Sequence, residues 1–202
     1  MKLQDIVAIS ACRTPMGSFG GTLKKMASYD IGAVAIKAAI ERAGITGDQI
    51  DDVILGSCRQ AGNRVNPART AAVRGGVTMD APAITLNMAC PSGMRAIGFA
   101  SQAIRLGESQ VVMVGGFDSM STIPYLLKNT RWSGFKMGDK NLEDGWSDSV
   151  DPVAGMGMGG TAEKLWDKYK IPREEQDQFA AESHEKAFKA WENGYFDAEV
   201  VP

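Results

Sequence analysis

The chain has 202 residues, 44% of them hydrophobic and 23% charged, a balance typical of a globular protein. Its formal net charge of −2 gives no electrostatic basis for binding nucleic acid or an anionic membrane. The three cysteines form no Cys-x-x-Cys pair, which disfavours both a disulfide framework and a zinc site. No apolar run reaches the roughly 18 residues of a membrane span, and residues 6–11 are too few for a signal peptide. From the cysteine pattern we expect a protein of the reducing cytoplasm.

Strand-like and helix-like segments alternate through the first 117 residues. Short β-rich runs predict four strands, over residues 5–10, 52–56, 83–86 and 110–114. Apolar residues at helical spacing, with start and stop signals, predict helices over 31–43, 66–74 and from Cys90 to about Leu106. Such alternation is typical of βαβ units, so the sequence predicts an α/β fold with a mainly parallel sheet.

The composition and the hydrophobic periodicity of the chain change after Gly116. Residues 117–160 are rich in Gly, Ser, Asp, Met and Trp and have no clear periodicity, and a segment of that kind is usually functional. Helices are predicted over 161–169 and 173–193, and residues 199–202 look like the start of another strand. We therefore divide the chain into an α/β core, residues 1–117, and a second domain, residues 118–202.

Cys90 is the strongest candidate for chemistry. It lies between a predicted strand and a long helix, and Pro91 suits the first helical position, which would place Cys90 at the N-cap. The positive end of the helix dipole would there favour the nucleophilic thiolate. A buried structural cysteine is the alternative. The residues of this helix are small or apolar on nearly every side. One sheet can cover only part of such a helix, so something else must cover the rest.

Other residues of reactive type carry weaker signals. Cys12 and Cys58 are interpreted as small buried hydrophobic residues. The single histidine, His184, has charged neighbours and is predicted to lie on a helix surface, so Cys90 has no obvious acid–base partner in this chain. Two of three aspartates could be paired as an acid and a base, but a solvated or turn role is favoured for each of the three: Asp118, Asp139 and Asp148.

A glycine- and methionine-rich run, Gly155–Thr161, precedes a predicted helix. It lacks G-x-G-x-x-G spacing and the lysine of a P-loop, so nucleotide hydrolysis is disfavoured. A methionine-lined wall for a partly apolar ligand and plain packing both remain open.

Five motifs, in order and at matching spacing, together resemble thiolases. They are ACRTPMGSFGG at residues 11–21, NPAR at 66–69, NMACPSGMRA at 87–96, GGFDSMS at 115–121 and MGGTAE at 158–163. The resemblance covers the whole chain and matches the N-terminal half of a thiolase (acetyl-CoA acetyltransferase or 3-ketoacyl-CoA thiolase). The fold it implies stacks two sheets around central helices, one of which carries the nucleophile.

The resemblance implies acyl transfer through a cysteine thioester. Cys90 would attack the carbonyl of an acyl-CoA or 3-ketoacyl-CoA, and its own backbone N–H would help to hold the oxyanion. Met158 and Trp146 would line the pantetheine channel, and residues 118–202 would be a loop domain for CoA binding and oligomerisation. Coenzyme A and acyl-CoA would be substrates, with no covalently bound cofactor and no metal.

The chain also departs from the family. Pro91 stands where the nucleophile signature usually has Gly, Ser or Ala, and Gly157 stands where some biosynthetic thiolases have histidine. The Gly-His-Pro, Cys-x-Gly and Asn-Glu-Ala motifs of a C-terminal half do not occur in this sequence. We expect a chain that is inactive, or nearly so, without that half, which would be a separate subunit or have been lost by truncation. A split subunit in a homo- or hetero-oligomer is favoured, because the chain ends cleanly after the loop domain.

Two other functions are considered. A condensing enzyme of the ketoacyl- or hydroxymethylglutaryl-synthase kind shares the acyl-cysteine step and differs in residues of the second half. A non-catalytic scaffold or acyl-CoA-binding subunit would keep the fold without the reaction. Acyl chain length and the favoured direction, thiolysis or Claisen condensation, are not specified by the residues.

Overall fold

The computed structural model describes residues 5–132, 134–146 and 150–202. The chain forms two compact units, Met1–Ile123 with Glu199–Pro202, and Pro124–Ala198. The first unit holds the sheet and Cys90, and the second holds a short hairpin and two helices.

A parallel three-stranded sheet forms the centre of the first unit. The strand order is β2 (Ala83–Leu86), β1 (Asp52–Gly56), β3 (Val112–Gly116), and β1 pairs in parallel with both neighbours. In register, Ile54 lies between Ile84 and Val114. The predicted α/β fold with a mainly parallel sheet is confirmed.

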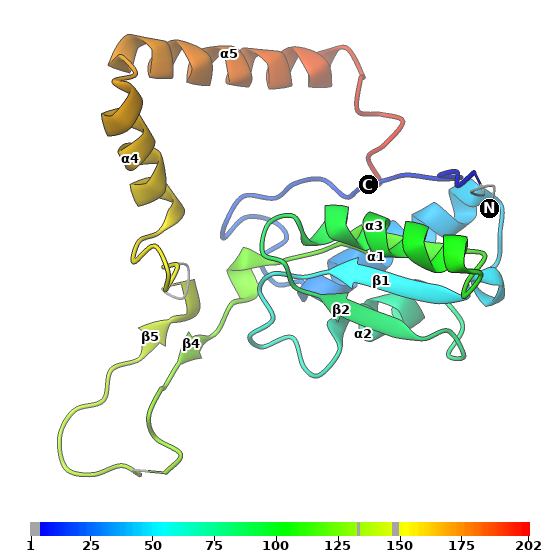
Figure 1. Ribbon diagram of the computed structural model, residues 1–202, viewed down its shortest axis with the longest axis horizontal. Coiled ribbons are helices and arrows are strands. Elements are labelled where there is room, and N and C mark those ends of the chain that lie inside the picture. Colours follow the sequence, from blue (N-terminus) through cyan, green and yellow to red (C-terminus); the bar gives the residue numbers. More distant parts are fainter. Residues whose placement is uncertain (1–4, 133, 147–149) are drawn as a thin grey trace. The chain divides into compact units, whose positions relative to one another are not determined.

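Helices cover the two faces of this sheet (Figure 1). Val53 and Leu55 of β1 pack with α1 (Ser28–Ala43) and α2 (Pro67–Arg74) in the larger core cluster. Ile54, which points to the other face because strand side chains alternate, packs with Ala96 and Ala100 of α3 (Ser92–Leu106). The small residues of α3 thus form its contact with the sheet.

The helix ends follow from local sequence. Asn66 is the N-cap of α2, where its side-chain oxygen accepts the N–H of Arg69 at 3.0 Å, and Pro67 occupies the first turn. α1 ends at Gly44, whose φ of 66° suits glycine because this residue has no Cβ. Two short 3₁₀ helices, η1 (Gly47–Gln49) and η2 (Met120–Thr122), lie in the connections.

Two strand predictions need correction. Residues 5–10 form no strand within the described part of the chain, where no strand pairs with them, and they are mostly exposed. The strand predicted over 110–114 is shifted to Val112–Gly116, because the side chain of Asp51 accepts the N–H groups of Gln110 and Val111 and ends the ladder there. Near the C-terminus, Val200 forms an isolated parallel bridge with Arg13.

The second unit contains β4 (Tyr125–Leu126) paired antiparallel with β5 (Glu143–Asp144), and the helices α4 (Met158–Tyr169) and α5 (Arg173–Glu192). Both helices lie close to their predicted ranges, and neither has a residue buried within this chain. None of the helices in the described residues has the length and apolarity needed to cross a membrane.

Candidate active site

Cys90 lies at the edge of the sheet where the parallel strands end, between β2 and α3, and it is exposed. The N-cap of α3 is Pro91 and the helix begins at Ser92, so the predicted assignment of Cys90 as N-cap is wrong by one residue. A turn closed by the Ser92 N–H and the Ala89 carbonyl (3.1 Å) includes Pro91, and the first helical bond runs from the Arg95 N–H to the Pro91 carbonyl (2.9 Å). Cys90 therefore immediately precedes the cap.

The turn around Cys90 has an unusual backbone. Ala89 has a φ of 55°, a left-handed conformation that costs a residue with a Cβ about 1–2 kcal/mol. The buried Ser92 hydroxyl donates to the Ala89 carbonyl (2.6 Å) and accepts the Met88 N–H (2.8 Å). The Ala89 N–H donates to Asn87 Oδ1 at 2.9 Å. Within the described part of the chain, the backbone N–H of Cys90 donates to no acceptor.

A close contact with β1 fixes the start of α3. A Cβ built on Gly56 would lie 2.6 Å from Ser92 Cβ and 2.7 Å from the Gly93 nitrogen. Only glycine allows strand and helix to approach this closely. The position of Cys90 relative to the sheet therefore depends on the absence of a side chain at Gly56.

Asp118 is the polar centre of the neighbouring loop. Its carboxylate accepts hydrogen bonds from the Ser57 hydroxyl (3.2 Å), the Cys58 N–H (3.2 Å) and thiol (3.1 Å), and the Arg59 N–H (2.9 Å). The predicted solvated or turn role of Asp118 is thus wrong, because the ends of β1 and β3 bring residues 60 positions apart together. A further bond, from Asn87 Nδ2 to the Cys58 carbonyl (3.3 Å), links this loop to the turn around Cys90.

The other two cysteines are half-buried rather than buried as predicted. Burial raises the pKa of the Cys58 thiol to about 11, and the hydrogen bond and charge of Asp118 contribute to the same rise. Burial also raises the pKa of Cys12, whose thiol donates to the Ala35 carbonyl at 3.2 Å. Both thiols are therefore protonated, and poor nucleophiles, at neutral pH.

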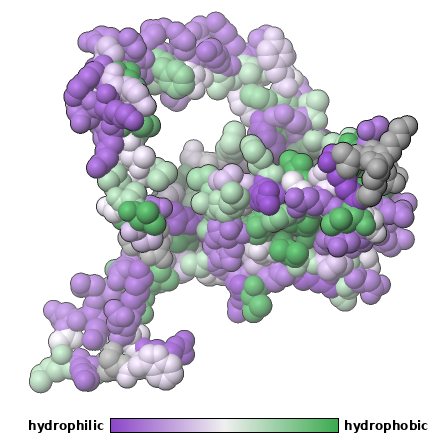
Figure 2. All heavy atoms as spheres, viewed as in Figure 1, coloured by the Kyte–Doolittle hydropathy of each residue, from purple (hydrophilic) through white to green (hydrophobic). Residues whose placement is uncertain are grey.

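Surface apolar side chains surround the start of α3. Met88, Pro91, Met94, Arg95 and Gly98 line a shallow hollow beside Cys90. Met94 is 77% exposed and Ile97 is 58% exposed, on the side of α3 away from the sheet. Figure 2 shows hydrophobic residues among hydrophilic ones on the surface of the protein. The sequence prediction that the sheet would cover only part of this helix is confirmed.

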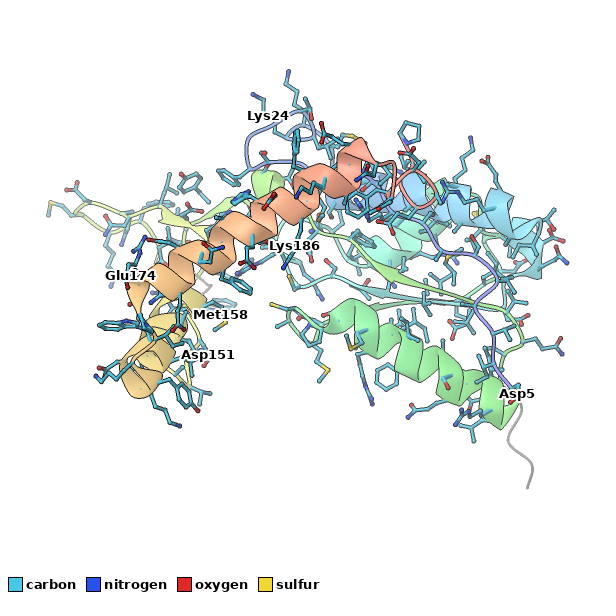
Figure 3. The ribbon with its side chains drawn as sticks, turned by 90° about the horizontal axis from the view of Figure 1, so that it is seen from above. Asp5, Lys24, Asp151, Met158, Glu174 and Lys186 are labelled. Atoms are coloured by element: carbon cyan, nitrogen blue, oxygen red, sulfur yellow. The ribbon has the colours of Figure 1, made fainter. Side chains whose placement is uncertain are left out.

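The remaining candidates lie in the second unit. Met158 is the first residue of α4 and is 63% exposed (Figure 3). Trp146 is half-buried, and its backbone N–H donates to Asp144 Oδ1 at 3.0 Å. His184 is exposed on α5, as predicted, while Asp148 lies outside the described residues. No group of three metal-ligating side chains occurs among the described residues.

Sequence reasoning did not single out Ser92 or Asn87, and it assigned Asp118 a solvated or turn role. All three side chains form hydrogen bonds with backbone groups, and no motif of reactive side chains reveals such bonds. One signal was present: Cys58 and Asp118 each follow a predicted strand closely, and the carboxyl ends of neighbouring parallel strands meet at one edge of the sheet.

Comparison with known proteins places the chain in a family. The family model described as "Thiolase, N-terminal domain" matches residues 6–202. A "Probable acetyl-CoA acyltransferase" of Staphylococcus epidermidis is 47% identical over 202 residues, which cover 99% of this chain and 51% of the relative. Its counterpart in Staphylococcus aureus is 44% identical over 199 residues, covering 98% of this chain and 50% of the relative.

Solved structures agree with the sequence relatives. The acetyl-CoA acetyltransferase of Bacillus anthracis superposes with a TM-score of 0.94 at 41% identity, over 99% of this chain and 51% of that protein. The acetyl-CoA acetyltransferase of Syntrophomonas wolfei gives a TM-score of 0.93 at 39% identity, over 100% of this chain and 51% of that protein. The chain thus spans about half the length of these relatives. It belongs to the thiolase family and comprises the N-terminal domain of that family.

Proposed function

We propose that this chain is the nucleophile-bearing half of a thiolase-type acyltransferase, and that Cys90 carries the acyl group. The observation that supports this most strongly is an exposed thiol at Cys90 beside a backbone N–H of the same residue, which has no acceptor among the residues that the structure describes. The relatives' names, acetyl-CoA acyltransferase and acetyl-CoA acetyltransferase, support the same class of reaction.

The proposed step is a transthioesterification. The Cys90 thiolate attacks the carbonyl carbon of an acyl-CoA and forms a new carbon–sulfur bond. The negative charge that develops on the carbonyl oxygen is stabilised by the Cys90 N–H, with help from the nearby start of α3. The bond from carbon to the sulfur of CoA then breaks, and CoA leaves as a thiolate that takes up a proton. Cys12 and Cys58 do not compete, because their raised pKa values keep them protonated.

The second half of the reaction needs groups that this chain does not supply. The sequence has one histidine, which is exposed on α5, and no Cys-x-Gly motif. We propose that a C-terminal thiolase half provides the histidine, the second cysteine and the asparagine, as a separate polypeptide in a homo- or hetero-oligomer. Met94 and Ile97, exposed on α3, supply apolar surface for it to cover.

The loop domain is proposed to bind coenzyme A. Met158 and Trp146 are the candidate residues for the pantetheine arm, and the exposed apolar side chain of Met158 supports this role. Replacing Met158 with Ala should raise the KM for acyl-CoA more than it lowers kcat, since this residue would bind ground state and transition state alike.

Substitution of Cys90 tests the proposed nucleophile. Thiolysis is measured on the chain together with any polypeptide that co-purifies with it from its source. We expect Cys90→Ala to lower kcat on the order of 10³-fold or more, as loss of a covalent nucleophile does elsewhere. Cys12→Ala, which removes a half-buried thiol from the same unit, is the matched control and should retain activity. Full activity in Cys90→Ala would favour a scaffold or acyl-CoA-binding role instead.

A further inference from the structure

The turn that carries Cys90 is held by the hydrogen bonds of two polar side chains, Ser92 and Asn87. Ser92 is 4% exposed, and its hydroxyl bonds to the N–H of Met88 and the carbonyl of Ala89, so it spans the two residues before the nucleophile. Asn87 bonds to the Ala89 N–H through its oxygen and to the Cys58 carbonyl through its nitrogen. Together they constrain the peptide groups on the N-terminal side of Cys90.

This constraint matters because the backbone there is strained. Ala89 has a φ of 55°, and a residue with a Cβ keeps such a conformation only where surrounding interactions hold it. The Cys90 N–H belongs to the peptide group that follows the Ala89 Cα, so rotation at Ala89 turns that N–H. If Ala89 relaxed to a common negative φ, the N–H and the thiol of Cys90 would no longer be held in their present relation.

Building on the proposed function, we propose that Ser92 and Asn87 are positioning residues that aim the Cys90 N–H at the oxyanion. The contact between Ser92 and Gly56 supports this, since it anchors one end of the turn to the central strand. Asn87 anchors the other end to the loop after β1, which Asp118 holds through its hydrogen bonds to Cys58. The carboxylate of Asp118 therefore acts on the nucleophile indirectly, through two loops.

The test distinguishes stabilisation of the oxyanion by the Cys90 N–H from the reactivity of the Cys90 sulfur. Acylation by a small thioester, S-acetyl-N-acetylcysteamine, forms an oxyanion, whereas alkylation by iodoacetamide requires only the thiolate. Both rates are measured at Cys90 by peptide mass mapping of the full chain, with any co-purifying polypeptide present. The ratio of the two rates reports on oxyanion stabilisation, and alkylation of half-buried Cys12 in the same samples reports on folding.

We expect Ser92→Ala to lower the ratio of acylation to alkylation about 10- to 100-fold, the usual consequence of misplacing a catalytic group by a fraction of an ångström to one ångström. Ser92→Thr keeps the hydroxyl and should restore most of the ratio. Ser101→Ala removes a half-buried serine from the same helix and should leave the ratio unchanged.

Asn87→Ala provides an independent variant if Ser92→Ala exposes Cys12 and so proves unfolded. Asn87 is exposed, and its loss should also lower the ratio while Cys12 remains protected. An unchanged ratio in the folded variants, with Cys90 acylated in the unmodified protein, would overturn this inference and leave the proposed function standing. No acylation of Cys90 in the unmodified protein would instead overturn the proposed function, and this inference with it.

Discussion

Replacing Gly56 with Ala adds one methyl group on β1, where this strand contacts the start of α3, and should displace the turn that carries Cys90. A Cβ at this position would lie 2.6 Å from Ser92 Cβ and 2.7 Å from the Gly93 nitrogen, both in the first turn of α3. Ordinary van der Waals contact begins near 3.4 Å, so strand and helix must separate by about 0.8 Å. Backbone atoms supply part of this contact, and no side-chain rotation relieves it.

Gly56→Ala is therefore expected to destabilise the fold by about 1–3 kcal/mol, the usual cost of overpacking a core. In an unhindered strand the same substitution would stabilise slightly, because alanine loses less conformational entropy than glycine on folding. Displacement of the helix start by nearly 1 Å should also slow acylation of Cys90 by about 10- to 100-fold. Urea unfolding and peptide mapping after exposure to a thioester measure the two effects.

Gly98→Ala is the matched control, because Gly98 lies in α3 and the nearest atom to its added Cβ is Arg95 Nη1 at 3.8 Å. There the higher helix propensity of alanine should raise the free energy of unfolding by about 0.5–1 kcal/mol. If Gly56→Ala were as stable and as readily acylated as the unmodified chain, the close contact would not be what positions Cys90.

Two further predictions concern the rest of the first unit. The folded-state pKa of Cys58 is raised from 9.0 to about 11, so its contribution to stability is complete below pH 9 and is lost as the pH rises towards 11. The expected loss is on the order of 1 kcal/mol after allowance for partial solvent screening. Cys58→Ala should abolish that part of the pH dependence in urea unfolding. An unchanged pH dependence in this variant would show that Cys58 is not its source. Asn66→Ala should lower the free energy of unfolding by about 1–2 kcal/mol through loss of the α2 cap, whereas Asn66→Asp, which keeps the acceptor oxygen, should lose less. Equal losses in both variants would show that capping is not the main role of Asn66.

The elements that the sequence predicts well are those whose signals are local. The range of β2 is predicted without error, and α2 begins one residue after its prediction, where Asn66 caps and Pro67 follows. Residues 5–10 have the composition of a strand, but a strand also needs a partner, and composition does not specify one.

The residues of the candidate site also differ in whether their signals are local. Cys90 can be found from its motif and from the proline that follows it. The roles of Ser92 and Asp118 depend on contacts across the sheet edge, over as many as 61 positions of sequence, and on backbone atoms that every residue shares. A single sequence carries little information about such contacts, and the fold is needed to reveal them.

We propose that Cys90 accepts an acyl group from an acyl-CoA, and acylation of this residue can be observed directly. The most direct measurement is peptide mass mapping of the protein after incubation with acetyl-CoA and rapid acid quenching, with any co-purifying polypeptide retained. We expect the mass of one acetyl group on the peptide containing Cys90, with Cys12 and Cys58 unmodified, and release of the acetyl group on addition of free CoA. An unmodified Cys90, or acetyl distributed equally among the three cysteines, would contradict this proposal.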